Sequence, residues 1–477
     1  MADMSQRTQQ AVDTARETVM AGAAEAGRVG RRIVKMIWDP QPVNDRTANK
    51  PVWCLGYSYT HESPARTESA SDAAARSEAA PPTTPSATAS RPAPDAAPET
   101  PPDSGSSSVS SSLAYEPSAE DNGWPPSFMD DFESRIWMTY RSNFEPIARS
   151  SDPKASASLS FAMRLKSLAD QSGFPSDTGW GCMIRSGQSL LANTLSICQL
   201  GRGEILVPGR WRRGTADREE RELLARFADD PRAPYSIHNF VRHGAVACGK
   251  YPGEWFGPSA TARCIQALAS SNEPSLRVYS TGDLPDVYED SFMAIAKPDG
   301  ETFHPTLILV GTRLGIDKIN QVYWESLTAT LQLPQSVGIA GGRPSQSHYF
   351  VGAQQAGDNS EPGSYLFYLD PHFTRLALPF HEDVEKYSKE DIDSCHTRRL
   401  RRLHVREMDP SMLIGFLISD EDDWDAWKDS VKYVQGKAVI RVSEHDPARG
   451  LPVEREGAID EVETLSDDDD DNSALGT

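Results

Sequence analysis

The chain has 477 residues, and its 48 basic and 69 acidic side chains give a formal net charge of −21. This charge argues against a nucleic-acid-binding groove, because a phosphate backbone is bound by a positive field. Six cysteines without any CxxC pair are too few for a secreted disulfide scaffold, so we expect a reducing, intracellular compartment and a cytoplasmic location.

The first segment in chain order is an N-terminal arm, residues 1–50, with 8 basic and 6 acidic side chains. Basic and apolar residues alternate over residues 28–37, a pattern typical of an amphipathic helix that contacts an anionic membrane. A frayed helix or a solvated arm explains the pattern equally well. The arm lacks the apolar core of a secretory signal, and no apolar run in the chain approaches the roughly 20 residues of a membrane span.

Two further segments are too polar to build a core. Residues 61–123 contain ten prolines, 3 basic and 10 acidic side chains, and predict a disordered insert. Residues 443–477 contain 2 basic and 12 acidic side chains and predict a disordered acidic tail. The remainder, residues 51–60 and 124–442, holds 329 residues with a net charge of only −6, and it can fold as one large domain.

Within this remainder, residues 51–59 predict a strand that precedes the insert. Phe132, Ile136 and Tyr140 recur at helical spacing and predict a helix over residues 128–144. Helical and strand-like stretches are intermixed without an internal repeat, so an α+β or α/β fold is expected.

The most informative stretch is residues 175–195, PSDTGWGCMIRSGQSLLANTL. Ile184, Leu191 and Leu195 share one helical face after a run of turn-forming residues, so Cys182 is predicted at the start of a buried helix. A helix N-terminus stabilises a thiolate, and the neighbouring glycines allow close approach of a substrate and offer N–H groups to an oxyanion. The alternative, a buried structural cysteine, stays open at this point.

A nucleophilic cysteine needs a base, and the sequence offers one at the end of a predicted hairpin. Residues 347–354 and 364–374 are rich in aromatic and β-branched residues and flank a turn-rich loop. Pro371 favours an extended conformation of Asp370, so Asp370 and His372 are expected to point to the same side. Asp370 would then orient the imidazole of His372, which would carry the proton. An Asp-Pro turn with an incidental histidine is the alternative.

Eight motifs run in order through the folded remainder and cover it almost from end to end. They are PVWCLGYSY (51–59), SRIWMTYRSNF (134–144), SDTGWGCMIRSGQ (176–188), WFGP (255–258), RLGIDKIN (313–320), LPQSVGIAGGRPSQSHYF (333–350), YLDPHF (368–373) and MDPSMLIGF (408–416). With these motifs the chain resembles the autophagins, the autophagy-related cysteine peptidases that process the ubiquitin-like autophagy modifier. The resemblance implies an α+β, papain-like cysteine protease fold with a small auxiliary subdomain, built from residues 124–442 and the strand at 51–60.

The resemblance also implies the roles of the site residues. Cys182 would be the nucleophile, with His372 and Asp370 completing a triad. Tyr140 would line the oxyanion site and Trp255 would lie over a narrow substrate entrance, although spacing alone makes both ordinary core aromatics. No metal and no organic cofactor is expected. The loop that covers the cleft until substrate lifts it would consist of Arg343, Pro344, Ser345 and Gln346.

The implied function is cleavage of the modifier after its C-terminal glycine, both to mature the precursor and to release the modifier from phosphatidylethanolamine. The expected partners are these two forms of the modifier and, transiently, the autophagic membrane; no nucleic acid is expected, and the protein is expected to be a monomer. Its expected location is the cytoplasm, with recruitment to the pre-autophagosomal structure, and the nucleus is a second compartment. Two alternatives are a deubiquitinase-like cysteine protease and a catalytically silent binding relative.

Overall fold

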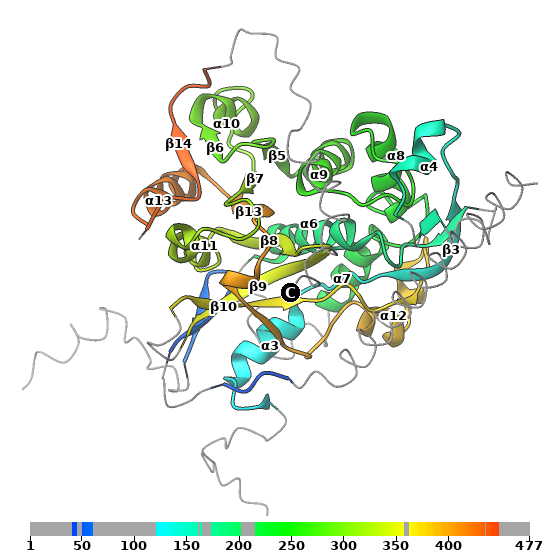
Figure 1. The fold of residues 1–477 in the computed structure, drawn as a ribbon, viewed down its shortest axis with the longest axis horizontal. Helices are drawn as coiled ribbons and strands as arrows, with labels where there is room; N and C mark the ends of the chain where they lie inside the picture. The colour runs from blue at the N-terminus through cyan, green and yellow to red at the C-terminus, as the bar shows by residue number, and fades with distance from the viewer. Residues whose placement is uncertain are drawn as a thin grey trace, which may run out of the picture.

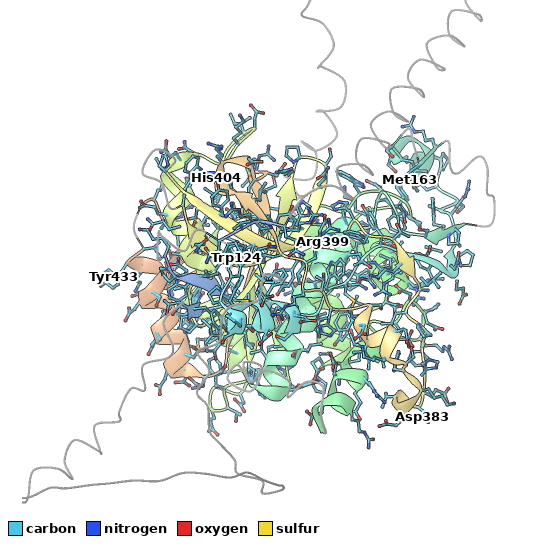
Figure 2. The ribbon with its side chains drawn as sticks, turned by 90° about the horizontal axis from the view of Figure 1, so that it is seen from below. Trp124, Met163, Asp383, Arg399, His404 and Tyr433 are labelled. Carbon is cyan, nitrogen blue, oxygen red and sulfur yellow. The ribbon has the colours of Figure 1, made fainter. Side chains whose placement is uncertain are left out.

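The computed structural model describes residues 41–44, 50–60, 121–160, 163–164, 173–201, 215–356, 362–434 and 436–447. Most of the predicted arm, insert and tail, and the basic stretch at 28–37, lie outside these ranges. The described ends of the arm and the insert contact each other: the backbone N–H of Asn44 donates to the carbonyl of Asn122 at 3.0 Å. Trp124, directly after the insert, lies within the body of the molecule (Figure 2). Its ring packs edge-on against Phe367, with 5.1 Å between ring centroids.

A nine-stranded sheet forms the centre of the described part of the chain (Figure 1). Its strands are β1 (Val52–Cys54), β2 (Tyr57–Tyr59), β5 (Arg277–Ser280), β7 (Thr306–Arg313), β8 (Ser336–Arg343), β9 (Gln346–Gln355), β10 (Ser364–Leu369), β12 (Arg401–His404) and β13 (Ser411–Ile418). Seven of them run in the order β12-β10-β9-β8-β13-β7-β5, and the hairpin of β1 and β2 adds to β9. Only β5 and β7 pair in parallel, so the sheet is mainly antiparallel.

Side-chain alternation along β13 separates two hydrophobic cores. Leu413 and Leu417 face one core, whereas Ile414 and Phe416 face the other, and the strand is apolar after Ser411 because helices cover both faces. On the first face lie α3 (Pro126–Ser134), α6 (Cys182–Leu200), α7 (Thr215–Ala225), α8 (Ile237–Ala247) and α9 (Pro258–Asn272). On the second lie α10 (Glu289–Ala296), α11 (Trp324–Thr330) and α13 (Glu421–Lys432), as Figure 1 shows.

Helix α6 packs closely on the first face because β13 carries a glycine beneath it. A Cβ atom at Gly415 would lie 2.7 Å from Val337 and 3.2 Å from Leu190 of α6, closer than packed side chains tolerate. The absent side chain lets the helix approach the sheet and fixes the position of its N-terminal residue, Cys182.

Two smaller sheets and several short helices complete the described part. β3 (Arg141–Ile147) lies between β11 (Arg375–Leu376) and β4 (Phe174–Ser176), and β6 (Asp286–Tyr288) pairs with β14 (Arg441–Ser443). The short helices are α4 (Pro153–Ser158), α12 (Lys389–Asp393), η4 (Gln321–Tyr323), η5 (Val384–Lys386) and η6 (Val405–Glu407). Among the described residues, no helix combines the length and the apolar character of a membrane span.

The predicted helix over residues 128–144 is wrong in its second half. α3 ends at Ser134, and the chain then runs extended into β3. The N–H groups of Ile136 and Met138 donate to the side chains of Asn193 and Ser189 on α6, at 3.1 Å and 2.9 Å, instead of to helical carbonyl groups. Since this segment is buried on all sides, its apolar spacing does not mark a helix face.

Other predicted elements fare better. The helix predicted to begin at Cys182 and the hairpin of residues 347–374 are confirmed as α6 and the β9–β10 pair. The single strand predicted at 51–59 is instead the β1–β2 hairpin. Its turn residues Leu55 and Gly56 both have positive φ, as a tight two-residue hairpin turn requires. Helices and a mainly antiparallel sheet together confirm an α+β fold.

Candidate active site

Cys182 is the first residue of α6, after the N-cap residue Gly181, and its side chain is buried. The preceding loop is fixed by the buried carboxylate of Asp177, which accepts the N–H of Arg141 at 2.6 Å and Nε of Arg185 at 2.8 Å. A Cβ atom at Gly181 would lie 2.3 Å from Asp177 Oδ2, so only glycine fits. The loop therefore holds the Cys182 thiol at the free N–H groups of the helix start.

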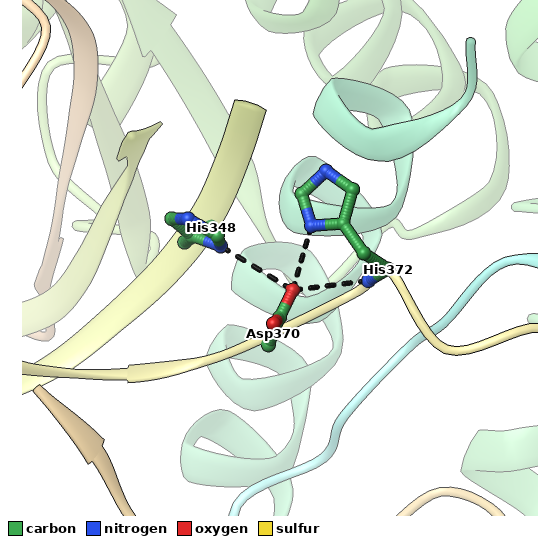
Figure 3. Close-up of side chains that lie close together, drawn as sticks. All are labelled: His348, Asp370 and His372. Carbon is green, nitrogen blue, oxygen red and sulfur yellow. Dashed lines mark hydrogen bonds and ion pairs between the residues drawn. The ribbon is translucent and has the colours of Figure 1, made fainter. Parts of the chain in front are cut away.

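Asp370 and His372 follow directly after β10, and their side chains meet (Figure 3). Asp370 Oδ1 accepts hydrogen bonds from Nδ1 of His372 at 2.6 Å and from its backbone N–H at 3.1 Å. The chain turns at Pro371 and His372 and is not extended as the sequence suggested. The Asp-Pro turn and the Asp–His pair, considered above as alternatives, are thus both present.

The electrostatics of the pair favour a thiolate and an imidazolium. With Nδ1 bound to Asp370, the buried Nε2 of His372 makes no conventional hydrogen bond and is left to interact with Cys182. Burial opposes both charges, but the hydrogen bond with His372 and its positive charge outweigh burial and lower the pKa of Cys182. Burial likewise opposes the imidazolium, but Asp370 and Cys182 together raise the pKa of His372 to about 10.

Tyr140 lies beside the same pair. Its ring stands edge-on to that of His372, with 5.3 Å between centroids, and its backbone N–H donates to the carbonyl of Pro371 at 2.8 Å. Burial first, and then the negative charge of Cys182, raises the pKa of Tyr140 well above its usual value. The hydroxyl therefore stays protonated and can donate a hydrogen bond near the thiol.

His348, on β9, is a site residue that the sequence analysis does not predict. Its Nδ1 lies 3.5 Å from Asp370 Oδ1, the oxygen that also binds His372 (Figure 3), an ion-pair distance that is long for a hydrogen bond. The two imidazole rings stand edge-on, with 5.3 Å between centroids. Burial lowers the pKa of His348, so the ring is neutral at neutral pH. The sequence predicts the hairpin but not its register. In the structure Leu369 pairs with Tyr349, which brings their neighbours Asp370 and His348 together.

His348, Asp370 and His372 also offer three ligand atoms within 4.8 Å of one another, a spacing that a metal ion can bridge. Asp370 Oδ1 is already bound by the imidazole and backbone N–H groups of His372. A protonated imidazole has no free lone pair for a metal. The arrangement therefore favours proton transfer over metal binding.

A small pocket of about 90 Å³ opens beside Cys182. It contains the predicted Trp255, whose Nε1 donates to the carbonyl of Gly179 at 2.9 Å. Ligand pockets for drug-sized molecules measure roughly 300–1,000 Å³, so this one suits a narrow chain end. The pocket is lined by Cys182, Met183, Trp255, Phe256, Pro258, Asp409, Ser411 and all residues from Gly341 to Ser347.

The predicted loop at 343–346 is the turn between β8 and β9 on the wall of this pocket. Ser345 has a φ of 63°, in the left-handed region that costs a residue with a side chain about 1 kcal/mol or more. Arg343 at the base of the turn binds Glu407 at 2.7 Å, and both side chains are exposed. The turn is therefore a strained hairpin tip held by a surface ion pair.

Comparisons with known proteins give one matching family model and several similar relatives. The model of the peptidase C54 catalytic domain matches residues 125–430. The chain is 75% identical over 465 positions to a probable cysteine protease ATG4 of Cryphonectria parasitica, covering 98% of this chain and 99% of the relative. It is 65% identical over 494 positions to a cysteine protease ATG4 of Pyricularia oryzae (95% and 99% covered) and 61% identical over 493 positions to a cysteine protease 1 of Neurospora crassa (97% and 94%).

Proposed function

Since the chain belongs to the peptidase C54 family and is a cysteine protease, we propose that Cys182 is its nucleophile and that His372 and Asp370 complete the triad. The membership confirms the autophagin resemblance and the papain-like α+β fold. The observation that carries the proposed roles is the convergence of a thiol at the start of α6 with an imidazole bound to a carboxylate at 2.6 Å.

In the first half of the reaction, the Cys182 thiolate attacks the carbonyl carbon of a substrate amide. The resulting oxyanion accepts hydrogen bonds from the Cys182 backbone N–H and the Tyr140 hydroxyl. The His372 imidazolium donates the Nε2 proton to the leaving amine, the C–N bond breaks, and a thioester remains on Cys182. Asp370 keeps the other ring nitrogen protonated and so keeps Nε2 directed at the reaction.

In the second half, neutral His372 takes a proton from water, which attacks the thioester. The carboxylic acid leaves, and Cys182 and His372 return to the thiolate–imidazolium pair. No other group needs to supply a proton or an electron. The raised pKa of His372 keeps the ring protonated at neutral pH, so a proton is in place for the leaving amine. Loss of the neighbouring thiolate charge in the thioester lowers that pKa, so His372 remains neutral and can accept a proton from water in the second half.

The proposed substrate is the ubiquitin-like autophagy modifier, cleaved after its C-terminal glycine. The pocket of about 90 Å³ under Trp255 and the 343–346 turn supports this proposal, because a larger side chain next to the cleaved bond would clash. Precursor and phosphatidylethanolamine-linked modifier both present an amide of that glycine, so one thiolate attack serves both. We place the reaction in the cytoplasm, with recruitment to the pre-autophagosomal structure and transient contact with its membrane.

Cleavage of purified substrates tests the proposal. The full chain should cut a modifier that carries a C-terminal extension and release modifier from liposomes, while Cys182→Ala and His372→Ala should lose both activities. Cys54→Ala is the matched control, because Cys54 is a buried cysteine on β1 whose pKa is raised by burial. Tagged ubiquitin should not be cut; efficient cleavage of ubiquitin and none of the modifier would support a deubiquitinase instead.

A further inference from the structure

Arg375 carries a positive charge that no carboxylate among the described residues balances. Its guanidinium carbon lies 5.0 Å from the centre of the Trp137 ring, and its Nε is buried without a hydrogen bond. Burial, and then the positive charge of Arg141, lowers the pKa of Arg375. By contrast, the buried Arg185 binds carboxylates. A half-buried cation of this kind costs free energy until an anion approaches it.

Trp137 connects this cation to the proposed catalytic centre. The indole Nε1 donates to the carbonyl of Asp370 at 2.8 Å, and the ring packs edge-on against Phe373, the residue after His372, with 5.9 Å between centroids. The backbone N–H of Arg375 donates to the carbonyl of Tyr140 at 2.9 Å. Arg375 is thus fixed through both its backbone and its side chain to residues that surround His372.

The substrate pocket lies elsewhere around the same pair. Its lining includes Cys182, Trp255 and the 343–346 turn, and it includes neither His372 nor any residue of the Trp137–Phe373 pair. In the proposed reaction the pocket holds the glycine whose carbonyl is attacked. The amine that His372 protonates would then leave outside the pocket. Trp137, Phe373 and Arg375 lie beside the Asp370–His372 segment and do not line the pocket.

We propose that Arg375 forms an anion-binding subsite for the leaving group, and that the anion is the phosphodiester of an ethanolamine phospholipid joined to the substrate glycine. The proposal rests on the function proposed above. In such a lipid only two carbons and one oxygen separate the amide nitrogen from the phosphorus, so a negative charge follows the cleaved bond closely. A peptide extension carries no such charge at a fixed position.

The guanidinium on the Trp137 ring suits this ligand. A planar guanidinium binds two phosphate oxygens at once, and stacking on an indole leaves its N–H groups available at the edge. A second guanidinium lies at the same aromatic pair, since the Arg399 guanidinium carbon is 5.7 Å from the Phe373 ring centre. Partial burial strengthens a charge pair relative to one in open water.

Soluble conjugates of the modifier give the direct test with the full chain. One conjugate carries ethanolamine on the terminal glycine, the other glycerophosphoethanolamine, and their kcat/KM values are compared. We expect the phosphodiester conjugate to be cleaved about tenfold faster, the effect of one partly exposed charge-assisted contact. In Arg375→Gln the ratio should fall to about one, and Arg375→Lys, which keeps charge and most of the packing, should keep part of it.

Arg402→Gln is the matched control, because Arg402 is also half-buried over an aromatic ring, Tyr365 at 4.2 Å, but lies on β12. It should retain the wild-type ratio. A wild-type ratio near one, or a ratio kept by Arg375→Gln, would overturn the proposal. Failure to cleave either conjugate would instead count against the proposed function itself.

Discussion

The pH dependence of Cys182 alkylation follows from the electrostatics of its pair with His372. The pKa of His372 rises from an ordinary value of 6.5 to about 10, a difference that corresponds to about 5 kcal/mol of preference for the imidazolium. The pKa of Cys182 is lowered, so its thiolate forms at a lower pH than that of an ordinary thiol, and the ion pair lasts until His372 loses its proton. The rate of alkylation by iodoacetamide should therefore reach its plateau at a lower pH than for an ordinary thiol, whose pKa is about 8.5.

Asp370→Asn is the perturbation that tests this reasoning. The substitution removes the carboxylate that binds Nδ1 of His372 at 2.6 Å, and the uncharged amide cannot stabilise an imidazolium. If Asp370 and Cys182 share the stabilisation about equally, roughly 2.5 kcal/mol is lost, and kcat/KM should fall about 70-fold. The alkylation rate of Asp370→Asn should rise with pH across the neutral range, because less of Cys182 is then ionised.

The assay labels the full chain with iodoacetamide at a series of pH values and quantifies modified Cys182 by mass spectrometry. The buried thiol of Cys54, whose pKa is raised mainly by burial, serves as the internal reference for an unreactive cysteine. A wild-type rate that climbs through the neutral range with the midpoint of an ordinary thiol, about pH 8.5, would refute the thiolate–imidazolium pair.

Three further substitutions probe other parts of the site. His348→Gln removes the ring 3.5 Å from Asp370 and should lower kcat about three- to tenfold with little change in KM; an unchanged kcat would show that this contact positions nothing. Asp177→Ala removes a carboxylate that binds the buried Arg185 at 2.8 Å and should lower the free energy of unfolding, measured in urea, by about 3–5 kcal/mol. A loss below about 1 kcal/mol would contradict a stabilising role of this ion pair. Glu407→Gln breaks the exposed pair with Arg343 and should change the free energy of unfolding by less than about 1 kcal/mol. Because substrate is expected to lift the 343–346 turn, a turn without this ion pair should lift more easily and lower KM about twofold. A higher KM would argue against a turn that lifts.

The parts of the site that the sequence predicted depend on local structure. The turn-forming residues before Cys182 and the helical spacing after it predict a helix start from a few neighbouring residues. Asp370 and His372 are only two positions apart, so their contact is formed within local structure and needs no distant segment. The structure reaches this contact through a turn rather than an extended strand, which local pattern alone does not distinguish.

The parts that the sequence did not predict depend on contacts between distant segments. The stretch after Ser134 leaves the helix because Asn193 and Ser189, more than fifty residues later, bind its N–H groups. His348 approaches Asp370 only through the register of β9 and β10. The proximity of Trp255 and the 343–346 turn to Cys182 was implied by family resemblance alone, since spacing gives no reason for residues so far apart to line one pocket.

The central claim, that Cys182 attacks the carbonyl of the modifier's terminal glycine, is tested most directly by covalent trapping. A modifier whose C-terminal glycine is replaced by an electrophilic warhead should form one adduct with the full chain, and peptide mass spectrometry should locate that adduct on Cys182. Formation should slow strongly in His372→Ala and Asp370→Asn. An adduct on any other cysteine, or equal labelling by a ubiquitin probe with the same warhead, would contradict the claim.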